Sequence, residues 1–233
     1  MYFYGIDPYV LMLVLPAFIF AMWAQANVKS TFNKYSRVPT GGHMTGADAA
    51  RAILNFNGLQ DVTVNMVDGN LSDHYDPRTR TVNLSREVYS AATVAAVGVA
   101  AHECGHAVQH ANGYMPLRLR NAIIPATQIG STLAMPLFFI GLIFSFPSLM
   151  NAGILLFAIV TLFQLITLPV EYNASSRAAN ILADSGMVSR EEETGVRRVL
   201  SAAALTYVAA LAVSLANLLR LLALAGGRRG GRD

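Results

Sequence analysis

Charged residues are scarce in this sequence: Asp, Glu, Lys and Arg make up 13% of its 233 residues, about half of the share in a typical soluble domain. Hydrophobic residues reach 54%, and the mean hydropathy is +0.42. So little charge cannot cover a water-exposed surface in the usual way, which excludes an ordinary soluble domain. We therefore expect an integral membrane protein.

Cysteine is almost absent as well. Cys104 is the single cysteine, which excludes an intramolecular disulfide and fits a reducing compartment. A concentrated basic region is also lacking, since the net charge of +3 comes from 17 basic and 14 acidic residues. The basic residues are spread over segments that flank apolar runs, where they orient the protein and contact membrane lipid. We expect no nucleic acid partner.

Four apolar stretches are each near the roughly 20 residues that a helix needs to cross a bilayer. They are Pro8–Ala26, Ile123–Phe146, Ala152–Val170 and Ala202–Ala225. The first has an alternative interpretation as a signal peptide, because Ala-Gln-Ala at 24–26 has the form of a processing site. Its leader contains no Lys or Arg, however, and basic residues follow the stretch, so we expect a retained anchor.

Basic residues also predict orientation. Nine Lys or Arg lie in Asn27–Asn121, four lie in Glu171–Ser201 and none lies in Ser145–Asn151, so both basic loops should face the cytoplasm. Four spans then put the arginine-bearing tail outside, against the positive-inside rule. The last stretch also contains Asn217 and Arg220, so its end should bend into the interface, line a cavity or let Arg220 snorkel.

Residues 102–106 read His-Glu-Cys-Gly-His, an H-E-x-x-H motif inside the run Val88–Ala111, in which two glycines are the only residues that weaken a helix. Positions i and i+4 lie on one helix face, so His102 and His106 can hold one metal ion. Glu103 lies beside them, where its carboxylate can deprotonate an attacking water. The competing interpretation is two ordinary core or surface histidines. Cys104 is expected to be a packing residue.

A catalytic zinc site needs a third protein ligand and an open position. The metzincin extension of the motif would require Gly and His where this chain has Gln109 and Asn112, which excludes that class. His110 lies on nearly the same helix face but about 6 Å further along the axis. We expect it to face solvent or to act outside the ligand set.

A carboxylate from another part of the chain is the better candidate for the third ligand. Glu171 follows the third apolar stretch, where the chain returns to the side of the motif helix. Asp184 lies in the helix-like run that follows and is a candidate to hold a ligand imidazole through its second nitrogen. The run Glu191–Glu193 is better interpreted as a solvated helix start, because carboxylates stabilise that end of a helix.

The segment 27–121 predicts a small α+β unit. Thr45 can cap a helix over 46–57 that Gly58 closes, and the alternation over 62–67 predicts a strand. An Asp-Pro turn predicts a hairpin over 73–84. An exposed edge of this hairpin can bind an extended polypeptide substrate, and the alternative is a purely structural hairpin that covers the helix.

Four stretches together carry a resemblance to a known family. They are Asp73–Arg78, Ala100–Ala107, Tyr114–Arg120 and Pro169–Ala178. With them the chain resembles the YugP-type bacterial neutral zinc metallopeptidases, a membrane family. The resemblance implies one Zn²⁺ per chain held by His102, His106 and Glu171, a catalytic Glu103, and a place in the bacterial cytoplasmic (inner) membrane.

The organisation is also similar to the membrane zinc peptidases related to the CAAX-protease and heat-shock-protease group. Their third ligand opens an E-x-x-x-D pattern, whereas the fifth position here is Ser175. The resemblance therefore implies that Asp184 or another group replaces the missing aspartate. For the transition-state charge, Arg177 and His74 are the nearest candidates, although Arg177 has the alternative of pairing with a membrane phosphate or a carboxylate.

Three functions remain open. The leading hypothesis is a membrane-bound zinc metalloendopeptidase that acts on cytoplasmic or membrane-proximal polypeptides, with Glu103 as general base. A site-2-type intramembrane protease is supported by the apolar run 91–101 before the motif, but no later apolar stretch offers the aspartate of that class. A scaffold with structural zinc would have no use for Glu103.

The expected fold is mainly α, a multi-pass membrane helical bundle with a small cytoplasmic α+β unit of zincin-like kind. Its predicted parts are an anchor helix (1–26), a catalytic region (27–121), a transmembrane hairpin (122–170), a cytoplasmic helix region with the third ligand (171–201), a membrane or interfacial helix (202–225) and a disordered Gly/Arg tail (226–233).

Overall fold

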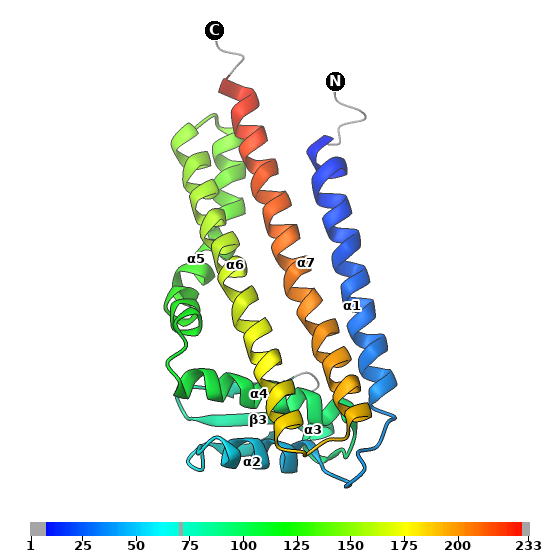
Figure 1. Ribbon diagram of the computed structural model, residues 1–233. Helices are drawn as coiled ribbons and strands as arrows, with labels where there is room; N and C mark the ends of the chain where they lie inside the picture. Colours follow the sequence, from blue (N-terminus) through cyan, green and yellow to red (C-terminus); the bar gives the residue numbers. More distant parts are fainter. Residues whose placement is uncertain (1–7, 70–71, 230–233) are drawn as a thin grey trace. The chain divides into compact units, whose positions relative to one another are not determined.

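A computed structural model describes residues 8–69 and 72–229, and these are mostly helical (Figure 1). The elements are a π-helix (Val10–Val14), α1 (Leu15–Tyr35), α2 (Gly46–Phe56), β1 (Thr63–Val67), β2 (His74–Asp76), β3 (Thr81–Ser85), α3 (Arg86–Ser90), α4 (Val94–Ala111), α5 (Met115–Ile143), α6 (Pro147–Asp184) and α7 (Arg190–Arg229). They form two compact units. The helical unit comprises the described parts of 1–24, 119–168 and 206–233, and the sheet-bearing unit comprises 25–118 and 169–205.

Four helices are long and apolar enough to cross a membrane, as the four apolar stretches predict. They are Val10–Tyr35, Met115–Ile143, Pro147–Asp184 and Arg190–Gly226. Each is longer than its apolar stretch, because the helix continues into polar sequence. The expected cytoplasmic helix region 171–201 is therefore built from the ends of two long helices: α6 continues past Glu171, and α7 begins well before Ala202.

The last helix is continuous. α7 runs as one helix through Asn217 and Arg220, which gives no support to a bend there, and the alternatives of a cavity or a snorkelling Arg220 stay predictions. The amide of Asn217 donates to the carbonyl of Val213, one turn earlier, so this polar side chain is satisfied within the helix. Residues 226–229 are helical where a disordered tail was expected, while 1–7 and 230–233 lie outside the described residues.

Small residues allow the helices of the helical unit to pack closely. A Cβ atom at Gly153 of α6 would lie 2.7 Å from the carbonyl oxygen of Ala134 in α5, so the two backbones touch there. Thr161 of α6 and Ser214 of α7 share a 2.8 Å hydrogen bond. Close backbone contact and interhelical hydrogen bonds are the interactions that hold helices together in lipid, where the hydrophobic effect gives no help.

The sheet-bearing unit contains the elements that the sequence predicts. Thr45 and Asp48 form a capping box at the start of α2, and Gly58 follows the helix at φ +71°. The sheet has the order β1-β3-β2, with β1 parallel and β2 antiparallel to β3. The predicted hairpin is confirmed, but only its strand β2 lies at an edge, because β3 is central.

Helix α4 contacts α2, α3 and the sheet (Figure 1). It begins at Val94, later than the start of the predicted run, because α3 takes up residues 86–90 and Thr93 caps α4 by accepting a hydrogen bond from the amide of Ala96. Its buried side chains are mostly alanine and valine. These short side chains let neighbouring helices come near the backbone of α4.

The closest such approach is at Gly105, inside the H-E-x-x-H motif. A Cβ atom there would lie 2.5 Å from the carbonyl oxygen of Ala174 in α6, which is closer than real Cβ atoms come. Gly98, on the same helix, is different: its Cβ would lie 3.6 Å from Cγ1 of Val196, an ordinary van der Waals distance. Gly105 is thus required for the contact of α4 with α6, and Gly98 is not required for the contact with α7.

We predict that Gly105→Ala destabilises the protein by about 1–3 kcal/mol, because the added methyl pushes α6 away from α4. Gly98→Ala should be neutral or stabilising by up to about 1 kcal/mol, because alanine favours the helix. Thermal unfolding of both variants in the same detergent measures the difference. Equal unfolding temperatures would show that the close approach at Gly105 is not required.

Candidate metal centre

The H-E-x-x-H residues lie in α4, where positions four residues apart share one face of the helix. His102 and His106 lie on the same face, with their rings edge to face and their centroids 4.7 Å apart. His106 is 9% exposed and Glu103 is 8% exposed. Two imidazoles and a carboxylate are therefore held near each other in a largely water-free place.

Glu171 of α6 completes the group. Its Oε2 lies 3.2 Å from Nε2 of His102 and 3.5 Å from Nε2 of His106, and the side chain is 2% exposed. The ligand atoms of the three residues all lie within 4.8 Å of one another. The structure thus brings together the three residues that the sequence proposed as ligands, although 65 residues of chain separate His106 from Glu171.

This donor set fits zinc. Two ligand atoms that each lie about 2.0–2.1 Å from a tetrahedral metal are roughly 3.3 Å apart, close to the carboxylate–imidazole separations found here. Two histidines and one glutamate are also a known set of protein ligands for catalytic zinc, which leaves one position for water or substrate.

Each imidazole also makes a hydrogen bond through its second ring nitrogen, Nδ1. His102 Nδ1 lies 3.1 Å from Oγ of Ser175, and His106 Nδ1 lies 3.0 Å from Oε1 of Gln109. For Nε2 to bind a metal, Nδ1 must carry the proton, and its N–H then donates a hydrogen bond to these oxygens. Ser175 therefore occupies the place of the expected aspartate and takes over its hydrogen bond.

Gln109 links the site to α6. It is fully buried, and its Nε2 donates to the carbonyl of Val170 at 2.8 Å and to Oδ1 of Asn173 at 2.9 Å. The same Oδ1 accepts a 2.8 Å hydrogen bond from Nε of Arg177. Arg177 is thus connected to His106 through two intervening side chains, and it orients Asn173.

The electrostatic field of the site favours a positive charge. Burial opposes protonation of the His106 imidazole, yet its contact with Glu171 and the charges of Glu103 and Glu171 outweigh this and raise its pKa. A metal ion would be attracted by the same two carboxylates. Cys104 faces the other way, toward the carbonyl of Ala50, and burial raises the pKa of its thiol far above the usual range. It is a packing residue, as expected.

Two further candidates from the sequence lie elsewhere. Asp184 is the last residue of α6, exposed, and 13 residues beyond Glu171, which is about 20 Å along a helix. The expectation that it holds a ligand imidazole was therefore wrong. His74 is exposed in β2, where its two nitrogens contact the carbonyl of Ser72 and the amide of Asn83.

The remaining polar groups have local partners. His110 is exposed, and its Nδ1 lies 2.9 Å from the hydroxyl of Tyr75 in β2. Glu191 is exposed at the start of α7, as expected. Its neighbour Glu192 has a further role, because it makes hydrogen bonds to other segments. Glu192 accepts hydrogen bonds from the amides of Ser189 and Gly41, so it joins α7 to the loop after α1.

Sequence reasoning missed Gln109 and recognised Ser175 only as a departure from a pattern. Gln109 was considered solely as a position that excludes a metzincin ligand. Its spacing of three residues from His106 does place both on one helix face, which is the one signal that pointed to a contact. The hydrogen bond from Ser175 to His102 had no local signal, because the two lie on different helices.

Known proteins resemble this chain over most of its length. The family model described as "Putative neutral zinc metallopeptidase" matches residues 10–226. The chain belongs to this family. It is also similar to the "Putative membrane protease YugP" of Bacillus subtilis (strain 168), with 50% identity over 208 residues that cover 89% of this chain and 92% of the relative. No solved structure matches the chain. The family resemblance inferred from the four stretches is confirmed.

We predict that Ser175→Ala lowers zinc affinity by roughly 10–100-fold, because the imidazole of His102 loses the group that orients it. The neighbouring Ser176→Ala is the matched control, since Ser176 is exposed on the same helix turn and should leave affinity unchanged. Competition with a chromophoric chelator measures both variants. Equal zinc affinity in the two would contradict an orienting role for Ser175.

Proposed function

We propose that this protein is a membrane-bound zinc metalloendopeptidase that hydrolyses peptide bonds of cytoplasmic or membrane-proximal polypeptides. The observation that carries the proposal is the convergence of Glu171 on both histidines of the H-E-x-x-H motif, with a second carboxylate, Glu103, next to His102 in the same helix. Membership of a zinc metallopeptidase family supports the same reaction class.

His102, His106 and Glu171 would hold the zinc ion. Bound zinc supplies Lewis-acid chemistry: it polarises a peptide carbonyl and makes a water molecule more acidic. Ser175 and Gln109 keep the two imidazoles in the tautomer that leaves Nε2 free to bind. Burial of the site keeps bulk water from screening these charges.

Glu103 is proposed as general base. It follows His102 on α4, is 8% exposed and is not one of the three residues whose ligand atoms cluster, which supports a role beside the metal and not as a ligand. It takes the proton of the attacking water and delivers that proton to the amine that leaves when the C–N bond breaks. A structural metal site has no need for this carboxylate, which argues against a scaffold with structural zinc.

Arg177 is proposed as a positioning residue. Its guanidinium donates to Asn173, which also accepts from Gln109, so it supports the hydrogen bonds that orient His106. The hydrogen bonds of His74 among the described residues go to Ser72 and Asn83 and not to the motif helix, and we assign no transition-state role to that residue.

The substrate is proposed to bind in an extended form along β2. This strand is an edge of the sheet, and an edge offers backbone N–H and C=O groups to a polypeptide without demanding a particular sequence. The hydroxyl of Tyr75 in β2 contacts His110, one turn beyond His106, so the strand lies against the motif helix. Substrate bound to the outer side of β2 would run past the same helix.

The motif is proposed to work outside the hydrocarbon of the membrane. Among the described residues, the candidate spans are in α1, α5, α6 and α7, and α4 is not one of them. This favours a membrane-bound peptidase over a site-2-type intramembrane protease, whose motif lies in a transmembrane helix. A cytoplasmic position of the sheet-bearing unit is part of this proposal, and the basic residues that flank the spans favour it.

Glu103→Gln is expected to abolish peptide hydrolysis while zinc content stays near one ion per chain. The substitution removes the base but none of the ligands, and its amide preserves the volume of the side chain. Hydrolysis of a fluorogenic peptide mixture and metal analysis of the same sample test this. Native activity in the variant would overturn the mechanism.

Glu171→Ala is expected to lower zinc occupancy and activity together, because two imidazoles alone leave the metal without enough protein ligands. Glu191→Ala is the control, since this exposed carboxylate lies at the start of α7. Zinc analysis after dialysis against a weak chelator compares the two. Full zinc occupancy in Glu171→Ala would transfer the ligand role to another residue.

Reporters of membrane sidedness test the orientation. A tag near Gly58 and one near Ser189 should both report the cytoplasm, and a tag in residues 146–151, between α5 and α6, should report the opposite side. The reason is the concentration of basic residues in the first two segments. Gly58 and Ser189 on opposite sides would be incompatible with a site that both segments build.

A further inference from the structure

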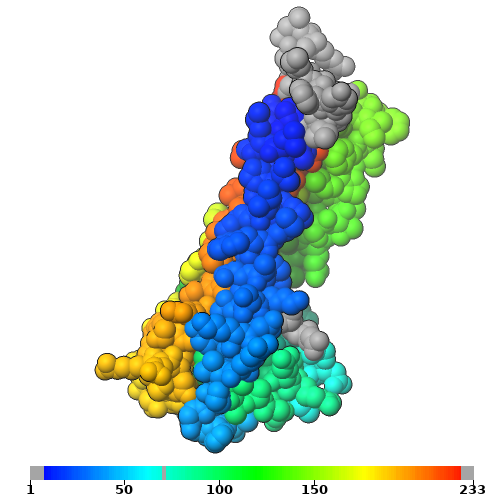
Figure 2. All heavy atoms as spheres, turned by 90° about the vertical axis from the view of Figure 1, so that its right-hand side faces the viewer, coloured from blue at the N-terminus to red at the C-terminus, as the bar shows by residue number. Residues whose placement is uncertain are grey.

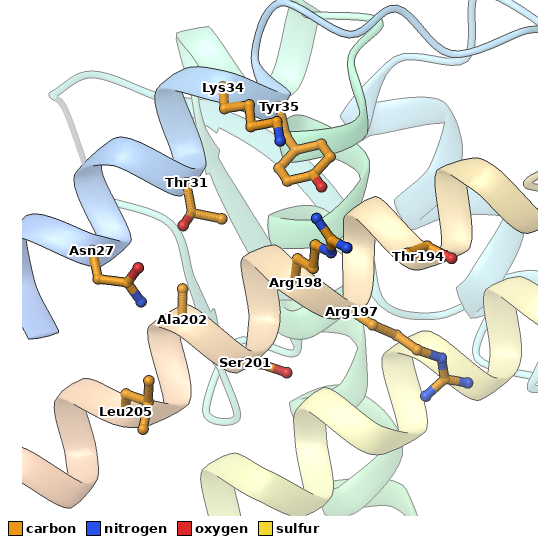
Figure 3. A pocket seen from close by; sticks show the side chains of 10 residues that line it. All are labelled: Asn27, Thr31, Lys34, Tyr35, Thr194, Arg197, Arg198, Ser201, Ala202 and Leu205. Atoms are coloured by element: carbon orange, nitrogen blue, oxygen red, sulfur yellow. The ribbon is translucent and has the colours of Figure 1, made fainter.

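An open cavity lies within the sheet-bearing unit, between the last turns of α1 and the first turns of α7 (Figure 3). Its volume is about 490 Å³, and none of the metal-centre residues lines it. The α1 wall belongs to a helix that is exposed along its length, with Ala24 as its only buried residue (Figure 2). The cavity is thus reachable from outside the protein.

The cavity concentrates positive charge without a matching negative charge. Lys34 and Arg198 line it, no described residue of the lining is acidic, and neither cation has a carboxylate partner among the described residues. Arg197 also contributes to the wall, but its guanidinium turns away from α1, and its Nε donates to Glu193 at 2.7 Å (Figure 3). Lys34 and Arg198 therefore leave a net charge that an anion would neutralise.

A neutral donor and an aromatic ring lie beside these two cations. The hydroxyl of Thr31 is on the α1 wall, and the ammonium of Lys34 is 5.4 Å from the ring centroid of Tyr35. Ser201 points away from α1, as Arg197 does (Figure 3). The planar fork of N–H groups on arginine, the compact charge of lysine and a hydroxyl donor together match the oxygens of a phosphate group.

The cavity is charged at one end only. Tyr35 packs against Gly195 at the charged end, whereas Asn27 lies opposite Ala202 and Leu205 at the other end. From this second end both helices continue into their candidate membrane spans. A ligand that fits has a phosphate at one end and an apolar body at the other, which is the pattern of a phospholipid rather than of free phosphate.

We propose that this cavity binds the headgroup of an anionic phospholipid, with its phosphate between Lys34 and Arg198 and its acyl chains directed along α1 and α7 past Leu205. The site goes beyond peptide hydrolysis and uses none of the metal-centre residues. One lipid bound there would join α1 to α7 at the edge of the membrane.

The experiment uses the full chain purified in a neutral detergent and titrated with dioleoylphosphatidylglycerol, dioleoylphosphatidylcholine or inorganic phosphate. Native mass spectrometry counts bound molecules per chain. The double variant Lys34→Gln/Arg198→Gln removes both cations of the cavity. Thr31→Phe fills the cavity and keeps every charge, so it tests the same site without altering the field.

The matched control is Lys29→Gln/Arg37→Gln. It also removes two positive charges from the chain, but from residues of α1 and the turn after it that line a neighbouring open groove, which shares only Lys34 with the cavity. Zinc content and the unfolding temperature of every variant check that the fold is retained. A general attraction of basic residues to anionic lipid predicts the same loss for both double variants.

We expect one phosphatidylglycerol per wild-type chain, with affinity at least about tenfold lower in Lys34→Gln/Arg198→Gln, because two charge-assisted hydrogen bonds to phosphate are lost. Thr31→Phe should show a similar loss, and the control should bind as the wild type does. Equal losses in the two double variants would overturn the site. Inorganic phosphate that competes as well as the lipid would overturn the assignment to a phospholipid.

Discussion

A buried carboxylate governs the arrangement of the sheet-bearing unit. Glu171 is 2% exposed, and removal of a carboxylate from water costs several kcal/mol unless positive or donor groups replace the water. The two imidazoles on α4 offer that replacement only if α6 lies against α4 almost without a gap. Gly105 and Ala174, which meet at that contact, have side chains small enough to allow it.

The contact between α4 and α6 also explains why the hydrogen bonds to Nδ1 of the two histidines come from both helices. Ser175, on α6, reaches His102, while Gln109, on α4, reaches both His106 and the backbone of α6 at Val170. The bond from His102 to Ser175 exists only when the two helices are together, and the bond from Gln109 to Val170 ties the group that holds His106 to the same contact. Metal affinity and helix packing are coupled through these bonds, so a change in either should affect the other.

Helix α6 connects two environments. Its first part belongs to the helical unit, which contains apolar spans, and from Pro169 onward it belongs to the sheet-bearing unit and carries Glu171, Asn173 and Ser175. The long helix α7 is divided in the same way between Leu205 and Thr206. Site residues and membrane spans therefore share continuous helices, which explains why the observed helices exceed the lengths of their apolar stretches.

The sequence by itself determined the features that depend on local spacing or on composition. The apolar stretches are recognisable because hydrocarbon thickness sets a helix length, and His102, Glu103 and His106 are recognisable because helical periodicity puts ligands on one face. The cap at Thr45 and the hairpin near Asp76 also follow from local chemistry. Glu171 was a good candidate through its position after a span and through family resemblance.

Only the tertiary structure decided which distant groups support the site. Asp184 had the right chemistry but lies about 20 Å from Glu171 along the same helix, while Ser175 and Gln109 hold the imidazoles. The cavity at Lys34 and Arg198 likewise joins residues far apart in the chain. Hydrogen bonds and shared cavities depend on distances of a few ångström between helices, and those distances come from packing, which no local pattern encodes.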